Sequence, residues 1–105
     1  MEEPNLKYIQ ELALGDEGFK QKLINIIKVE LPVEIDAYTM NMKNGHFMKA
    51  AENVHKLKHK ISILGLEKSY YLATGFEEDL KIESLEKRGE FEIILSQMTK
   101  FVNIL

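Results

Sequence analysis

The sequence predicts an all-α fold, an antiparallel up-down four-helix bundle with a short N-terminal capping helix. Apolar residues recur at steps of three and four along most of the chain, and no stretch alternates long enough to form a half-buried strand. The periodic stretches are separated by a few residues only, and short connections favour antiparallel neighbours. With 105 residues, the chain is expected to form a single domain over residues 1–105.

The first two predicted helices meet at Gly15. Residues 5–14 form a short helix, and Asp16 is the expected N-cap of the next one, because a carboxylate there accepts from the free amides of the first turn. The second helix ends at Asn44-Gly45. Its apolar stripe stays in phase across Leu31-Pro32, so we expect the proline to kink the helix without ending it. The stripe comprises Phe19, Leu23, Ile26, Ile27, Leu31, Ile35, Tyr38 and Met42.

Three further helices are predicted over residues 46–64, 67–86 and 90–105. Gly65 ends the first of them, and Arg88-Gly89 forms the turn before the last. Each presents an apolar face at helical spacing: Phe47, Ala50, Val54, Leu57, Ile61 and Leu64 in the first; Tyr70, Ala73, Phe76 and Leu80 in the second; Phe91, Ile94, Leu95, Met98, Phe101, Val102 and Leu105 in the third.

Composition excludes several classes of function. The chain has no cysteine, no nucleotide-binding glycine motif and a net charge of -3, which argues against thiol chemistry, an ATP-dependent kinase and a general nucleic-acid binder. No run approaches the roughly 18 apolar residues of a membrane-spanning helix, and the acidic start Met1-Glu2-Glu3-Pro4 is unlike a secretory leader. We therefore expect a cytoplasmic protein that binds neither membranes nor nucleic acids and acts as a monomer.

The candidate functional residues lie on the third predicted helix. His55 points about 130° away from the core stripe of this helix, so it should face solvent. The candidate partner-binding residues around it are Met48, Ala51, Lys56, His59 and Ser62. Lys43–Lys60 carries five lysines against one acid, Glu52, a local charge of +4 that is also compatible with an ordinary solvated face.

An exposed imidazole in a basic environment suits attack on a phosphoryl group. The neutral ring is a competent nucleophile near neutral pH, and ammonium groups attract the anionic substrate while disfavouring the imidazolium form. Lys58, one turn beyond His55, is expected on the same solvent-facing side of the helix, where it could offset charge on the phosphoryl oxygens.

His55-Lys56-Leu57-Lys58, followed by Ser62 and Gly65, resembles the signature of histidine-containing phosphotransfer domains. The resemblance covers nearly the whole chain, including the Leu14-Gly15-Asp16 opening and Phe76-Glu77-Glu78. It implies that His55 accepts a phosphoryl group from a receiver-domain aspartate, assisted by Lys58, and passes it to another. The implied partners are response-regulator receiver domains and a hybrid histidine kinase, with Mg²⁺ on the receiver and no cofactor on this chain. His59 departs from the family pattern, which has glycine there, and Lys60 and Ile61 replace residues that are usually small.

Alternative interpretations remain open. Because His59 replaces the family glycine, an alternative function is a phosphorylation-inactive adaptor that binds receiver domains. His55 and His59 have the i, i+4 spacing of a metal clamp, but no third ligand is identifiable and the lysines would repel a dication, so no metal site is predicted. A kinase dimerisation domain is disfavoured because no proline follows His55 closely. Tyr70-Tyr71 is interpreted as packing and Glu77-Glu78 as a solvated helix face.

Overall fold

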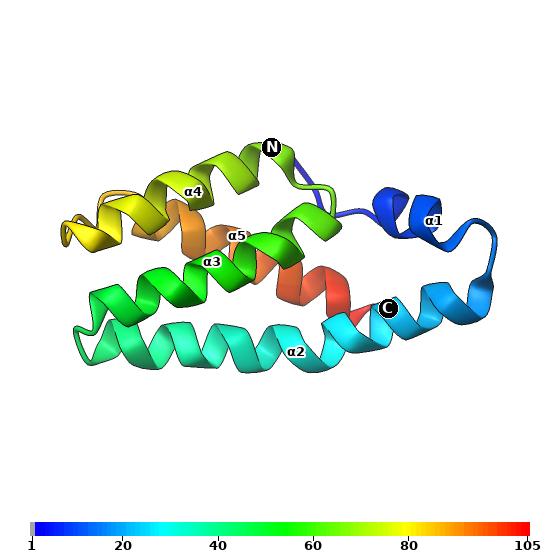
Figure 1. The fold of residues 1–105 in the computed structure, drawn as a ribbon, viewed down its shortest axis with the longest axis horizontal. Coiled ribbons are helices and arrows are strands. Elements are labelled where there is room, and N and C mark those ends of the chain that lie inside the picture. The colour runs from blue at the N-terminus through cyan, green and yellow to red at the C-terminus, as the bar shows by residue number, and fades with distance from the viewer. Residues whose placement is uncertain (1) are drawn as a thin grey trace.

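The computed structural model describes residues 2–105, which form five α-helices (Figure 1). No β-strand occurs in this range, which confirms the all-helical prediction. None of these helices is both long and apolar enough to cross a bilayer. The helices are α1 (Lys7–Ala13), α2 (Glu17–Lys43), α3 (Phe47–Ile63), α4 (Glu67–Lys81) and α5 (Arg88–Asn103).

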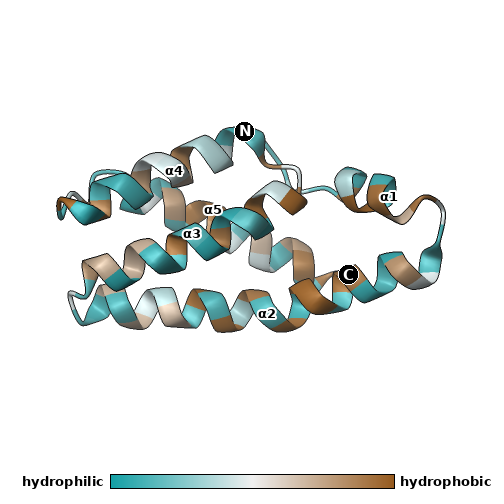
Figure 2. Ribbon diagram, in the orientation of Figure 1, coloured by the Kyte–Doolittle hydropathy of each residue, from teal (hydrophilic) through white to brown (hydrophobic). Residues whose placement is uncertain are grey.

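The helices from α2 to α5 reverse direction at each connection, so that consecutive helices run antiparallel (Figure 1). Helix α3 packs against both α2 and α4, while α5 contacts α2 and α4, and α1 contacts α2. The molecule is elongated, with extents of 44 × 24 × 19 Å. Along the ribbon of α2, apolar and polar segments alternate without a long apolar run (Figure 2).

The start and course of α2 follow the sequence prediction. The Asp16 carboxylate accepts a hydrogen bond from the backbone N–H of Phe19 at 3.0 Å, which confirms its capping role. The helix continues through Pro32, as predicted. The predicted stripe is wrong at two positions, because Phe19 and Ile26 are 44% and 49% exposed. Both lie on the outer side of the helix, and the α2 residues that enter the core are Ile24, Ile27, Leu31, Tyr38 and Met42.

The turn after α3 is tied to the N-terminal segment. The backbone N–H of Asn5 donates to the carbonyl oxygen of Leu64 at 2.9 Å. Gly65 has φ +78°, a conformation that favours glycine, and a Cβ there would lie 2.5 Å from Asn5 Nδ2. The positive φ therefore favours glycine at residue 65, and a Cβ there would require the Asn5 side chain to move.

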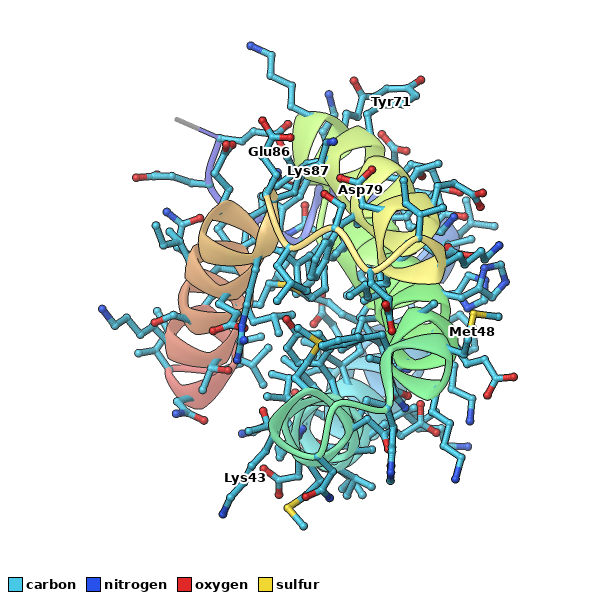
Figure 3. All side chains as sticks on the ribbon, turned by 90° about the vertical axis from the view of Figure 1, so that its left-hand side faces the viewer. Lys43, Met48, Tyr71, Asp79, Glu86 and Lys87 are labelled. Carbon is cyan, nitrogen blue, oxygen red and sulfur yellow. The ribbon has the colours of Figure 1, made fainter. Side chains whose placement is uncertain are left out.

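Helix α4 ends at Lys81, earlier than the predicted residue 86. Glu83 adopts φ +58° and the N–H of Ser84 donates to the carbonyl of Asp79, which turns the chain away from the helix. Lys87 Nζ lies 2.7 Å from Asp79 Oδ2, and the two side chains meet beside this connection (Figure 3). Helix α5 accordingly begins at Arg88, two residues before the predicted start.

Three aromatic rings join α2, α4 and α5 in the core. Tyr38 lies edge-on to Phe76 and Phe91, with centroids 6.4 Å and 5.3 Å away, and the two phenylalanine rings are 5.1 Å apart. All three residues are buried, and such ring pairs stabilise a core beyond their buried area. Tyr38 Oη also donates to Glu92 Oε2 at 2.9 Å, so this buried hydroxyl is satisfied.

Candidate functional site

His55 lies on the face of α3 opposite the core, as predicted. The core residues of this helix, Ala50, Val54, Leu57 and Ile61, are fully buried at steps of three and four, which turns His55 outward. Its side chain is 57% exposed. The imidazole is therefore open to solvent and to a partner.

The ring of His55 is held by a carboxylate from α4. His55 Nδ1 lies 3.3 Å from each carboxylate oxygen of Glu77, whose side chain is only 14% exposed. In a neutral imidazole, Nδ1 donates to this carboxylate, so the proton sits on Nδ1 and the Nε2 lone pair is left free. The contact selects the tautomer in which Nε2 is the nucleophilic atom.

Lys58 lies beneath the surface, not on the open face that the sequence suggested. Its side chain is 10% exposed, and Nζ lies 3.1 Å from Glu77 Oε1. The ammonium also donates to Thr74 Oγ1 at 3.4 Å and lies 5.2 Å from the centre of the Tyr70 ring. The prediction of an exposed Lys58 is wrong because α4 covers this side of α3 and supplies a carboxylate, a hydroxyl and an aromatic face to the ammonium.

The candidate site also contains Glu77, which the sequence prediction did not include. It was interpreted as part of a solvated helix face, but its carboxylate contacts both Lys58 Nζ and His55 Nδ1. Partial burial alone raises the pKa of its carboxyl, but hydrogen bonds from Lys58 and His55 outweigh burial and hold that pKa below its ordinary value of 4.5. A signal was available, because Glu77 lies one turn from both Ala73 and Leu80 and so borders the buried stripe of α4.

The predicted partner-binding residues are exposed with one exception. Met48 is 63% exposed and projects from α3 (Figure 3), and Lys56, His59 and Ser62 are also exposed. Ala51 is only 3% exposed, so the prediction that it lies on the open face is wrong. Its methyl group is too short to reach past the neighbouring side chains where α3 and α4 meet.

A hollow of about 610 Å³ lies beside His55 between α3 and α4. It is lined by His55, Glu77, Ala51 and six neighbours, namely Met48, Lys49, Glu52, Asn53, Lys56 and Lys81. Three of the lining residues are lysines, and Lys81 pairs with Glu78 at 2.9 Å. Among residues 2–105, Lys49 and Lys56 have no ion-pair partner, so the hollow offers a partner two ammonium groups beside the imidazole, together with the carboxylate of Glu52.

The basic segment is less basic at the surface than its charge of +4 suggested. Lys60 points toward α2, where Nζ lies 2.8 Å from Glu30 Oε1 and 3.1 Å from Glu34 Oε2. Desolvation lowers the pKa of Lys60, but hydrogen bonds to these two carboxylates raise it more. Together with Lys58, this leaves Lys43, Lys49 and Lys56 as the exposed cations of the segment.

His59 contacts His55 ring to ring. The two centroids are 5.5 Å apart at an interplanar angle of 77°. Within residues 2–105 no group of three or more histidine, cysteine or acidic side chains is arranged to hold a metal ion. His46 precedes α3 at its N-cap position, as expected for a residue at a helix start.

Comparison of the chain with protein-family models, with curated proteins and with solved structures gives no match. The geometry of the site is therefore the basis for a function. That geometry combines an open imidazole, a carboxylate that fixes its tautomer, and a hollow with free ammonium groups. The arrangement suits nucleophilic attack by Nε2 on an anionic electrophile.

Proposed function

We propose that the chain is a histidine-containing phosphotransfer protein of a two-component phosphorelay. His55 accepts a phosphoryl group from the aspartyl phosphate of one receiver domain and passes it to the aspartate of another. The observation that carries the proposal is the exposed imidazole of His55 with Nδ1 hydrogen-bonded to Glu77. The partners are response-regulator receiver domains and a hybrid histidine kinase, acting in the cytoplasm.

The transfer step uses the free lone pair of Nε2. Nε2 of His55 attacks phosphorus in line, a nitrogen–phosphorus bond forms, and the bond from phosphorus to the aspartate oxygen breaks. The electron pair of that bond returns to the receiver carboxylate. The ring becomes cationic as Nε2 bonds to phosphorus, and the adjacent Glu77 carboxylate offsets this charge. Mg²⁺ belongs to the receiver, so this chain needs no cofactor of its own.

Lys58 supports the same step through Glu77. Its ammonium lies 3.1 Å from the oxygen that also contacts His55 Nδ1, so it fixes the carboxylate in place. It also keeps a positive charge next to the imidazole, which favours the approach of a phosphoryl group. Lys58 is therefore proposed to act both by positioning Glu77 and by offsetting phosphoryl charge.

The proposed docking face surrounds His55. Met48, Lys56, His59 and Ser62 are exposed there and would contact the receiver. Apolar Met48 with flanking ammonium groups fits a small interface that forms and separates quickly. His59 occupies the position of the family glycine and is proposed to select among receivers by steric exclusion.

The fold supports this function. The proposed architecture is an up-down four-helix bundle of α2 to α5, capped by the short helix α1. It is supported by the antiparallel course of the helices and by the contacts of α3 and α5 with both α2 and α4 (Figure 1).

Incubation with a phosphorylated receiver domain tests the proposal. The chain should acquire a phosphate that is acid-labile and base-stable, and His55→Gln should abolish it with melting temperature nearly unchanged, since exposed side chains contribute little to folding. Full labelling of the variant would overturn the assignment of His55. Receiver binding without labelling of the wild-type chain would favour the alternative, an inactive adaptor.

The role of His59 has its own test. His59→Gly should broaden the set of receivers that react with the chain, because it removes the side chain next to His55. An unaltered partner profile would show that His59 does not set specificity.

A further inference from the structure

The outer face of α2 carries a line of exposed apolar side chains. Ile26, Val29, Val33 and Met40 are 49%, 69%, 65% and 56% exposed. Their spacing of three, four and seven residues places them along one side of the helix, away from buried Leu31. The buried residues of α2 lie on its other side, and α1, α3 and α5, the helices among residues 2–105 that contact α2, leave these four side chains exposed.

This apolar line differs from the outer face of α3. The exposed positions of α3 after Met48 are polar or charged, namely Lys49, Glu52, His55, Lys56, His59 and Ser62. Single exposed apolar residues are ordinary, but several apolar side chains along one side of a helix indicate a contact surface. The repeat of apolar residues at 26, 29, 33 and 40 is also the spacing by which two helices pack together.

Two unpaired charges on the same face indicate the partner. Lys22 and Asp36 are exposed, and neither has an ion-pair partner in the described part of the chain. Each lies seven residues from Val29, one on either side. An antiparallel copy of the same helix, centred on Val29, would therefore bring Lys22 of each copy opposite Asp36 of the other.

We propose that two copies of this chain form an antiparallel dimer through the outer face of α2, about a two-fold axis near Val29. Ile26, Val29 and Val33 form the apolar centre, with a reciprocal Lys22–Asp36 pair at each side. Gly18 and Met40 lie eleven residues to either side of Val29, so the absent side chain of Gly18 leaves room for Met40 of the second copy.

The size of this surface predicts a reversible dimer. With 27 residues, α2 is about 40 Å long at 1.5 Å per residue. A contact one helix wide over that length is smaller than the roughly 800 Å² per partner of a standard stable interface. We therefore expect a dissociation constant in the micromolar range.

The dimer does not depend on the proposed phosphotransfer function. The hollow beside His55 is lined only by α3 and α4, so pairing through α2 leaves both His55 side chains open. From the sequence we expected a monomer. The sequence prediction assigned Ile26 to the core. Because Ile26 instead lies exposed on the outer face of α2, we propose a dimer.

Sedimentation velocity of the full chain over a micromolar concentration series tests the dimer. The wild-type chain should shift from monomer to dimer, and Val29→Asp should abolish the shift while keeping its helical circular dichroism. Ile93→Asp is the matched control, because it makes the same change from an apolar to an acidic side chain at a 51% exposed position on α5. This variant should dimerise normally. A wild-type chain that stays monomeric, or equal effects of the two variants, would overturn the proposal.

A charge exchange tests the geometry of the pair. Lys22→Glu and Asp36→Lys should each weaken dimerisation several-fold, because like charges then face each other. The double variant should restore it, since both reciprocal pairs re-form with reversed sign. If the double variant does not recover dimerisation, the antiparallel register centred on Val29 is excluded. All these measurements use the unphosphorylated chain, so their outcome is independent of phosphotransfer.

Discussion

Glu77 Oε1 and Oε2 each lie 3.3 Å from His55 Nδ1, although 22 residues separate the two side chains along the sequence. The same carboxylate receives Lys58 at 3.1 Å. One acidic side chain on α4 therefore orients the candidate nucleophile on α3 and holds Lys58, the lysine that the sequence suggested as its helper, beside it. This arrangement makes Glu77 the first residue to test.

Glu77→Gln should slow phosphotransfer to His55 by about 10- to 100-fold, the range typical for loss of a partner that orients a reactive histidine. The amide can still accept from Nδ1–H but carries no charge to offset the cationic ring. Rates of labelling by a phosphorylated receiver measure the effect, and nitrogen-15 shifts of the imidazole report its tautomer. Glu78→Gln is the control, because the ion pair of Glu78 in the described part of the chain is with Lys81 and not with His55 or Lys58. Equal rates in both variants would remove Glu77 from the mechanism.

The lowered pKa of Glu77 predicts a pH dependence of stability. A carboxyl whose pKa is lower in the folded chain stabilises the fold above its ordinary value of 4.5, and this contribution is lost as pH falls through the folded pKa. The free energy of unfolding of the wild-type chain should therefore exceed that of Glu77→Gln at neutral pH. The difference should shrink in acid, as measured by urea unfolding at several pH values. A difference independent of pH would contradict the assignment.

Lys58→Met should destabilise the chain, because it keeps the buried aliphatic stem but removes the ammonium from Glu77 and Thr74. We expect a loss of about 1–3 kcal/mol in the free energy of unfolding, together with slower transfer to His55. Lys56→Met is the matched control on the exposed side of the same helix and should change stability by less than about 0.5 kcal/mol. Similar losses in the two variants would show that the ion pair contributes nothing.

Gly65→Ala should destabilise the chain more than Gly15→Ala. Both glycines have positive φ, at +78° and +84°, so both changes carry the conformational cost of about 1–2 kcal/mol for a residue with a Cβ. Only the Cβ at residue 65 would collide with the side chain of Asn5, whereas nothing lies within 4 Å at residue 15. Thermal unfolding measures both variants, and Asn5→Ala should relieve part of the excess at residue 65. Equal losses would show that the Asn5 contact yields without cost.

Helical periodicity was sufficient to predict the helices, the Asp16 cap and the exposure of His55. Periodicity was insufficient to predict the burial of side chains at the edge of a core stripe, because their burial depends on which neighbouring helix covers them. Lys58 and Lys60 flank the core stripe of α3 on opposite sides, and each becomes buried because α4 or α2 supplies carboxylates to it. The end of α4 was also missed, since the turn at Glu83 follows from backbone conformation and not from apolar spacing.

The hydroxyl of Tyr38 makes the attachment of α5 observable by spectroscopy. Burial, followed by its hydrogen bond to Glu92, raises the pKa of this phenol far above its ordinary value of 10.0. The chain contains no tryptophan, so tyrosine dominates its near-ultraviolet absorbance. In an alkaline titration, the phenolate signal of Tyr38 should emerge only when α5 separates from α2, which turns one core residue into an intrinsic optical reporter of that event.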